Sequence, residues 1–293
     1  MTSLKRLKIL HCTKLKELPK SFGNLQSLRM LHLSQCSHLE ELPSSLTLLT
    51  RLTTLNLTGC LSLKMVPTGL GNLTTMKTLN LSQCSSLKEL PESLGKLVRL
   101  TTIDLSRCAG LKELPKSLGN LTSLTTLNLS RCSVLEKLPA SFGHITCLRK
   151  INLSWCLSLK TLPETLGKLI SVNTLNLSNC IGLEELPKSF GSLTSLTTLN
   201  LSRCSSLREM HASVGTLVSL KNLNLSHCSS LRDLPDSLGT LTSMRTLNLF
   251  GCTGLRELPT SSVNYQIVIQ NEQRMMMLVK AILVCDEMGA PVT

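Results

Sequence analysis

Residues 121–139 read LTSLTTLNLSRCSVLEKLP and residues 193–210 read LTSLTTLNLSRCSSLREM, so the run LTSLTTLNLSRC begins at 121 and again at 193. Each copy of this run ends in a cysteine, and the cysteines recur along the chain with a constant spacing. They occupy positions 12, 36, 60, 84, 108, 132, 156, 180, 204, 228 and 252, while Cys147 and Cys285 lie off this grid. A fixed period of this length indicates a solenoid or another repeat array.

The period divides the chain into eleven units, from 1–24 to 241–264, followed by a tail at 265–293. The consensus unit is L-T-S-L-T-T-L-N-L-S-x-C-S-S-L-K-E-L-P-x-S-L-G-N, and its letters are numbered 1–24 below. Within it, L-x-x-L-x-L-x-x-C-x-x-L matches the leucine-rich repeat template, with cysteine where asparagine is more common. We therefore predict a repeat domain over 1–264 and a separate C-terminal tail over 265–293.

The consensus predicts an α/β-type solenoid of eleven 24-residue repeats, with a parallel concave β-sheet and convex extended or 3₁₀ segments. In L-x-x-L-N-L-S the leucines alternate, as in a half-buried strand. Eleven rungs at roughly 4.8 Å each give a sheet about 50 Å long. Proline at position 19 prevents a regular helix. Serine at position 21 and glycine at position 23 predict a turn, in which we expect the glycine to adopt positive φ.

The cysteines of the grid are predicted to be structural: Cys36, Cys60, Cys84, Cys108, Cys132, Cys156, Cys180, Cys204, Cys228 and Cys252. Each follows a strand, where its side chain points inward and its thiol can bond neighbouring backbone while acting as a small hydrophobe. An odd count of eleven with parallel side-chain directions disfavours a disulfide ladder and favours reduced thiols. No Cys-x₂-Cys or Cys/His cluster indicates a zinc site, and no cofactor is expected.

Composition and charge limit the partners. The formal net charge is +13, but basic residues are spread along the chain and many stand beside acids, as in Lys88-Glu89 and Lys112-Glu113. With one Trp and one Tyr there is little for bases to stack on, so we expect no nucleic acid partner. No stretch approaches the roughly 18 apolar residues of a membrane helix, and no secretory signal is visible. We therefore expect a cytoplasmic protein without a membrane partner.

The concave face is the predicted binding surface. Position 8 is asparagine in eight units and Asp104 in another, and we expect this ladder to hydrogen-bond along itself. Position 11 varies most between units, and loops on a rigid scaffold often carry binding. The candidate residues are Asp104, Arg107, Arg131, Arg149, Lys150, Trp155, Asn179, Arg203 and His227. Trp and Arg dominate interface energetics, so we expect a basic-aromatic patch around Arg131, Lys150 and Trp155; the alternative is that Trp155 only lies across the sheet edge.

Catalytic motifs are missing. The sequence has no phosphate-binding G-x-x-x-x-G-K-[ST] loop, G-x-S-x-G, H-E-x-x-H or kinase signature, and its six histidines are scattered over five unit positions. We expect no enzyme. In the tail, 272–288 has apolar residues at 275, 278, 279 and 282, which predicts a helix. This helix could cap the last repeat, bind a partner, or come from a read-through.

The unit L-x-x-L-x-L-S-x-C-S-S-L-x-x-L-P-x-S-h-G-N-L, over 1–264, resembles repeats of plant nucleotide-binding disease-resistance proteins with a Toll-like domain. The resemblance implies a leucine-rich repeat region that recognises proteins in plant innate immunity. The Toll-like and nucleotide-binding domains of that class are absent from this sequence, so only the recognition role carries over. Intracellular leucine-rich scaffolds that bind small GTPases share L-P-x-x-h-G-x-L and give the alternative function. A fragment of a larger receptor is a third reading.

Overall fold

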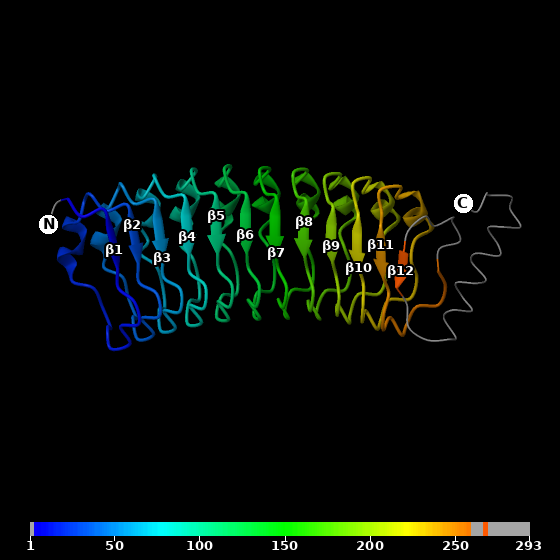
Figure 1. The fold of residues 1–293 in the computed structure, drawn as a ribbon, viewed down its shortest axis with the longest axis horizontal. Helices are drawn as coiled ribbons and strands as arrows, with labels where there is room; N and C mark the ends of the chain where they lie inside the picture. Colours follow the sequence, from blue (N-terminus) through cyan, green and yellow to red (C-terminus); the bar gives the residue numbers. More distant parts are fainter. Residues whose placement is uncertain (1–2, 259–265, 269–293) are drawn as a thin grey trace, which may run out of the picture.

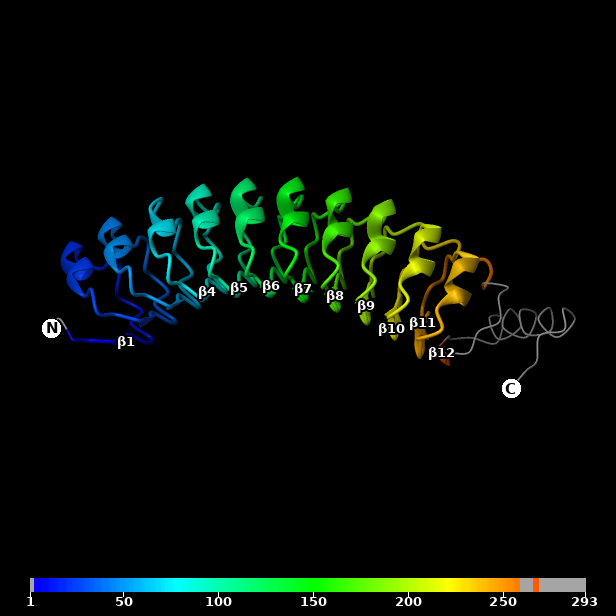
Figure 2. The same ribbon diagram turned by 90° about the horizontal axis from the view of Figure 1, so that it is seen from above.

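The computed structural model describes residues 3–258 and 266–268. The chain winds into a shallow arc whose strands line the concave side and whose 3₁₀ helices line the convex side (Figures 1 and 2). Neighbouring turns are stacked in chain order from β1 to β12. The predicted solenoid, with one parallel sheet inside and 3₁₀ segments outside, is confirmed.

Each strand covers three residues, which are positions 6–8 of its unit in β1–β11. Neighbouring strands pair in parallel and in strict unit register, so that Leu127 lies opposite Ile103 and Ile151. The twelve strands are β1 (Arg6–Lys8), β2 (Met30–His32), β3 (Thr54–Asn56), β4 (Thr78–Asn80), β5 (Thr102–Asp104), β6 (Thr126–Asn128), β7 (Lys150–Asn152), β8 (Thr174–Asn176), β9 (Thr198–Asn200), β10 (Asn222–Asn224), β11 (Thr246–Asn248) and β12 (Gln266–Val268).

A short 3₁₀ helix follows each extended outer segment in the first ten units. In most units proline at position 19 precedes it with φ near −65°, because the ring fixes the extended entry. The helices are η1 (Lys20–Asn24), η2 (Ser44–Leu48), η3 (Leu70–Asn72), η4 (Glu92–Lys96), η5 (Lys116–Asn120), η6 (Ala140–His144), η7 (Glu164–Lys168), η8 (Lys188–Ser192), η9 (Ala212–Thr216) and η10 (Asp236–Thr240).

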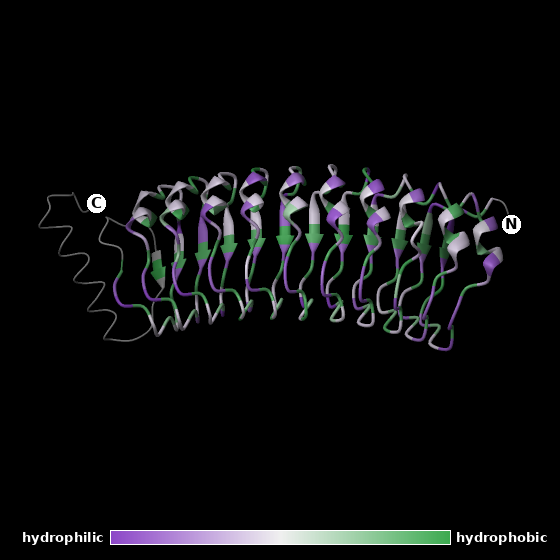
Figure 3. Cartoon of the chain, turned by 180° about the vertical axis from the view of Figure 1, so that it is seen from behind, coloured by the Kyte–Doolittle hydropathy of each residue, from purple (hydrophilic) through white to green (hydrophobic). Residues whose placement is uncertain are grey.

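The core consists of columns of aliphatic side chains between the sheet and the 3₁₀ layer. In unit 6, Leu121, Leu124, Leu129 and Leu135 are fully buried, and Phe142 of the 3₁₀ helix fills the space that leucine takes elsewhere. Hydrophilic stretches recur turn after turn on the exterior (Figure 3). Since each turn packs on the next, burial is completed by stacking rather than within one unit.

The glycine at position 23 has a different role from the one predicted. Positive φ at glycine occurs at Gly59 and Gly251, both at position 11, whereas no glycine of position 23 has it in the described residues. A Cβ added at Gly119 would lie 2.4 Å from the backbone oxygen of Ser141 in the next turn. The expectation of positive φ at position 23 was therefore wrong: this glycine is needed because two turns touch there.

Unit 2 lacks this glycine, and the next unit compensates for the change. Position 23 is Thr47 there, and the facing position 21 of unit 3 is Gly69 instead of the usual serine or threonine. A Cβ at Gly69 would lie 3.2 Å from Cγ2 of Thr47. At this joint the residue with a side chain stands at position 23 and the glycine at position 21, the reverse of the usual arrangement. The helix η3 is shortened to Leu70–Asn72.

The sheet continues into the predicted tail. The strand β12 pairs in parallel with β11, with Gln266 opposite Thr246. Fewer residues of the sequence separate Thr246 from Gln266 than separate the partners in the other strand pairs. The sequence period that defines the units therefore does not reveal β12. The predicted helix 272–288 lies outside the described residues.

Candidate functional site

Position 11, where the chain leaves each strand, recurs rung after rung along one edge of the concave face, with glycine in units 3 and 11. We call the side chains of position 11 the exit ridge. All nine non-glycine residues of the ridge have positive φ, from 56° at His11 to 64° at Trp155. This left-handed conformation is uncommon for residues with a Cβ and costs of order 1 kcal/mol or more. It is imposed here at every rung.

Backbone hydrogen bonds on both sides hold this conformation. The N–H of Arg131 donates to the carbonyl of Ser154 in the next turn (2.7 Å), and the N–H of Cys132 donates to the carbonyl of Leu129 in its own turn (3.1 Å). The same pair of bonds recurs at Trp155 and Cys156. The backbone is therefore fixed independently of the side chain, so position 11 can vary without changing the fold.

Arg131 and Trp155 form a contact across neighbouring rungs. The Arg131 guanidinium carbon lies 5.0 Å from the centroid of the Trp155 ring, which is a cation–π distance. Trp155 is 42% exposed and Arg131 is exposed as well. Asn179 is half-buried on the next rung. The indole is thus an accessible aromatic surface with a cation against it, as binding hot spots often have.

Arg149 and Lys150 do not join this contact. Lys150 lies in β7 between Thr126 and Thr174, at the beginning of the strand. Position 6 begins the strand, and position 11 lies in the turn beyond its end, at most about 16 Å away along the chain. The predicted single basic-aromatic patch is therefore two features: Arg149 and Lys150 at the entry edge of the sheet, and Arg131 with Trp155 at the exit edge.

The asparagine ladder makes local bonds rather than bonds along the sheet. The Oδ1 atom of Asn128 accepts the backbone N–H of Ser130 (3.1 Å), and the other seven asparagines of position 8 accept equivalent bonds of 2.9–3.0 Å. Asp104 does the same toward Ser106 (2.9 Å). The expectation that the ladder bonds along itself was wrong, because the N–H two residues on is a closer donor.

The remaining candidates lie farther along the exit ridge. Arg107 and Arg203 are exposed, and the ring of His227 stands edge-on to Phe250 with centroids 5.2 Å apart. Sequence reasoning missed Phe250, although it replaces the serine that position 10 usually carries and is 36% exposed. That break in the consensus was the available signal.

The cysteines of units 2–11 form a buried spine. Each thiol donates to the carbonyl of position 9 in the preceding turn, at 2.9–3.6 Å, as Cys132 does to Leu105 at 3.2 Å. All ten of these cysteines are fully buried. Burial raises the pKa of Cys60, Cys132, Cys180 and Cys228 to about 12, which keeps these thiols protonated donors.

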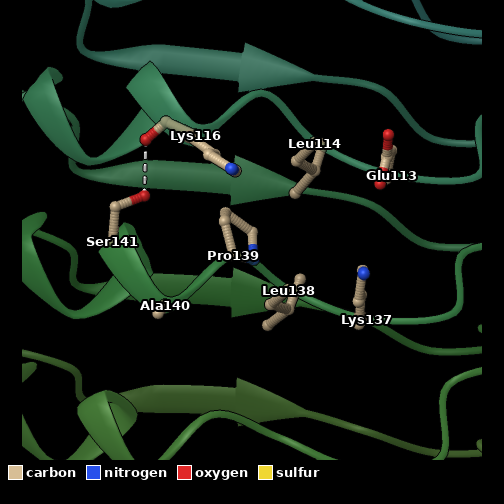
Figure 4. A pocket seen from close by; sticks show the side chains of 8 residues that line it. All are labelled: Glu113, Leu114, Lys116, Lys137, Leu138, Pro139, Ala140 and Ser141. Atoms are coloured by element: carbon tan, nitrogen blue, oxygen red, sulfur yellow. Dashed lines mark hydrogen bonds between the residues drawn. The ribbon is translucent and has the colours of Figure 1, made fainter.

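The outer side of the solenoid has shallow hollows between turns. One of about 330 Å³ lies between units 5 and 6, with Leu114, Leu138 and Pro139 beneath and Lys116 at the rim (Figure 4). Ser141 Oγ donates to the Lys116 carbonyl across it (2.6 Å). The lining holds no His or Cys and offers no nucleophile–base pair.

A family model described as "Leucine-rich repeat region" matches residues 1–106 and 148–265, and one described as "Leucine Rich Repeat" matches residues 123–145. The chain is a leucine-rich repeat protein. No curated protein sequence matches it.

Several solved leucine-rich repeat structures share its fold. The Drosophila Toll–Spatzle complex has 22% identity and a TM-score of 0.58, covering 89% of this chain and 40% of that one. The leucine-rich repeat domain of the type III effector XopL has 23% identity, a TM-score of 0.51, and coverage of 87% and 73%. An internalin (inlF) from Listeria monocytogenes has 18% identity, a TM-score of 0.50, and coverage of 95% and 85%. At these identities the likeness establishes the fold alone.

The described part of this leucine-rich repeat protein lacks two kinds of feature. Within residues 3–258 and 266–268, no helix combines the length and hydrophobicity needed to span a bilayer. The same residues contain no group of three or more His, Cys, Asp or Glu side chains placed to hold a metal ion.

Proposed function

We propose that this leucine-rich repeat protein is a non-catalytic recognition module that binds a protein partner on its concave face, centred on Arg131 and Trp155. The observation that carries the proposal is the accessible cation–π contact on the exit ridge. A fixed backbone pre-organises these side chains, which lowers the entropic cost of binding. The ridge offers no nucleophile–base pair, which favours recognition over catalysis.

The resemblance of the repeat unit to plant Toll-like-domain disease-resistance proteins supports a role in plant innate immunity. In that role the chain would recognise a pathogen-derived or modified host protein in the cytoplasm. The row of buried thiols is compatible with a reducing compartment.

The test compares binding variants that leave the backbone unchanged. Asparagine already occupies the left-handed position 11 at Asn179 and tolerates that conformation better than most residues. Trp155→Asn and Arg131→Asn therefore remove the contact without new strain, and Gln83→Asn makes the same change elsewhere on the ridge. Partners captured from plant cytosol by the full chain should be lost with the first two variants and retained with Gln83→Asn.

Two outcomes would count against the proposal. Capture that is indifferent to both substitutions would move the site away from the exit ridge. Capture of a small GTPase in only one nucleotide state would support the scaffold function instead, since a resistance-type recognition region has no reason to distinguish GDP from GTP.

A further inference from the structure

The excess positive charge of the chain is concentrated on the concave face. Positions 5–11 of the eleven units, here called the concave strip, are joined from rung to rung by backbone hydrogen bonds. They hold twelve Lys and Arg residues and one acid, Asp104. The other seventeen positions hold 17 Lys and Arg residues and 14 acids. Seven positions of 24 therefore carry a net charge of +11, and the remainder of the repeat domain carries +3.

All twelve basic side chains of the concave strip are exposed: Lys5, Arg6, Lys8, Arg29, Lys77, Arg107, Arg131, Arg149, Lys150, Arg203, Lys221 and Arg245. Among the described residues, the ion pair within 4 Å is Lys64–Glu40, which lies on the outer side. Burial and the charge of Lys8 lower the pKa of His32 at the first rungs of the strip. The concave strip thus has uncompensated charge, whereas the outer side alternates basic and acidic residues.

The neutral residues of the concave strip also present donors. A backbone N–H bonds the Oδ1 atom of each position-8 asparagine, as Ser130 does at Asn128, and this fixes the orientation of the amide. The Nδ2 group then faces away from that bond, and no hydrogen bond between described residues uses it at position 8. Eight amide groups therefore add N–H donors beside Lys and Arg side chains, which have no acceptors.

We infer that the partner on the concave face is an acidic protein surface or segment whose carboxylates accept from these amide, ammonium and guanidinium groups. The inference rests on the proposed function and specifies its ligand. Complementary charge of this kind accelerates association and selects partners. The strands line the inside of a shallow arc (Figure 2), and the shape complementary to that face is a convex surface.

A nucleic acid would meet the same charge but finds little to stack on. The exposed aromatic side chains of the concave strip are Trp155 and Phe250. They are four rungs apart, which is about 19 Å. Single-strand binding relies on aromatic side chains on which successive bases stack. The concave strip has many hydrogen-bond donors, one acid and two distant aromatic rings. It is therefore better suited to bind carboxylates than to stack bases.

The experiment uses the full chain and sodium poly-L-glutamate as the acidic polypeptide probe. Five concave residues away from the exit ridge are neutralised together: Lys77→Gln, Arg149→Gln, Lys150→Gln, Lys221→Gln and Arg245→Gln. The matched control neutralises five exposed outer residues: Lys88→Gln, Lys112→Gln, Lys160→Gln, Lys168→Gln and Lys188→Gln. Both variants lower the net charge from +13 by five.

We expect the concave variant to bind poly-L-glutamate about thirtyfold more weakly, since an exposed ion pair contributes roughly a factor of two in affinity. The outer variant should lose less than about threefold, and wild-type binding should weaken with salt. Equal losses in the two variants would overturn the inference. Tighter binding of a single-stranded oligonucleotide than of poly-L-glutamate at equal salt would overturn it as well.

The inference and the proposed function fail separately. Consider a natural partner that is lost with Trp155→Asn but retained by the concave fivefold variant at high salt. That result would support the recognition site at Trp155 and contradict the inference that the partner is acidic.

Discussion

The buried thiols should make this protein unfold more readily at alkaline pH. Burial raises the pKa of Cys132 and Cys180 from the ordinary 9.0 to about 12. A raised folded-state pKa means that the unfolded chain loses its thiol protons first. The contribution of each buried thiol to stability is therefore complete below pH 9 and decreases as the pH rises from 9 toward 12.

The size of the effect follows from the unfolded-state pKa. One pH unit above 9, the thiol of an unfolded chain is mostly thiolate, while a thiol with pKa about 12 remains protonated. One pKa unit corresponds to about 1.4 kcal/mol, so each such thiol costs about 1.4 kcal/mol of stability at pH 10 compared with pH 8. The figure does not depend on the folded pKa as long as that pKa is well above 10.

The assay is urea unfolding at pH 8 and pH 10, followed by circular dichroism in a reducing buffer of constant ionic strength. The variant Cys132→Ala/Cys180→Ala lacks two buried thiols. Its free energy of unfolding should therefore fall between pH 8 and pH 10 by about 2.7 kcal/mol less than that of the wild type. Leu135→Ala removes a buried side chain without a titrating group, so it should lower stability by about 2–5 kcal/mol equally at both pH values. An identical pH dependence in the wild type and the double cysteine variant would refute the reasoning.

Three further predictions concern packing, hydrogen bonding and thiol access. Gly119→Ala places a Cβ against the Ser141 backbone and should lower stability by about 1–3 kcal/mol in a thermal melt; no loss would show that the turns can separate. Asn128→Ala removes the acceptor of the Ser130 N–H and should lower stability by about 0.5–1.5 kcal/mol. Asn128→Asp should lower it less, because Asp104 accepts the equivalent bond in its own unit. In native buffer, Cys12 and Cys147 should react quickly with a thiol reagent, and the ten buried cysteines should react only after denaturation; rapid reaction of more than three thiols per chain would contradict their burial.

The sequence predicts the repeat because each layer of the core comes from one consensus letter. Leucines at the same position of consecutive units must stack, so period and register follow directly, as Leu127 between Ile103 and Ile151 shows. The inward cysteine and the 3₁₀ turn after proline follow from the same pattern. The strand β12 does not, because its shorter step from β11 breaks the period.

The candidate site was predicted as a set of residues but not as an arrangement. Position 11 shows variability in the sequence, but its left-handed backbone depends on hydrogen bonds to the next turn. Gly59, Asn179 and Gly251 at that position were the signal available, since these residues favour positive φ. Likewise, a residue count gives the net charge of +13 but not how this charge is distributed over the surface. Only the fold places positions 5–11 on one face.

The contact between Thr47 and Gly69 limits how the repeats can be rearranged. Most joints between units would be interchangeable, because glycine at position 23 of one unit meets serine or threonine at position 21 of the next. Unit 2 is different. If a deletion joined it to unit 4, Thr47 would face Ser93 at a joint where even a Cβ at Gly69 would lie 3.2 Å from Cγ2 of Thr47. Unit 2 therefore depends on unit 3 as the unit that follows it, whereas unit 3, with Gly69, also fits after a unit with glycine at position 23.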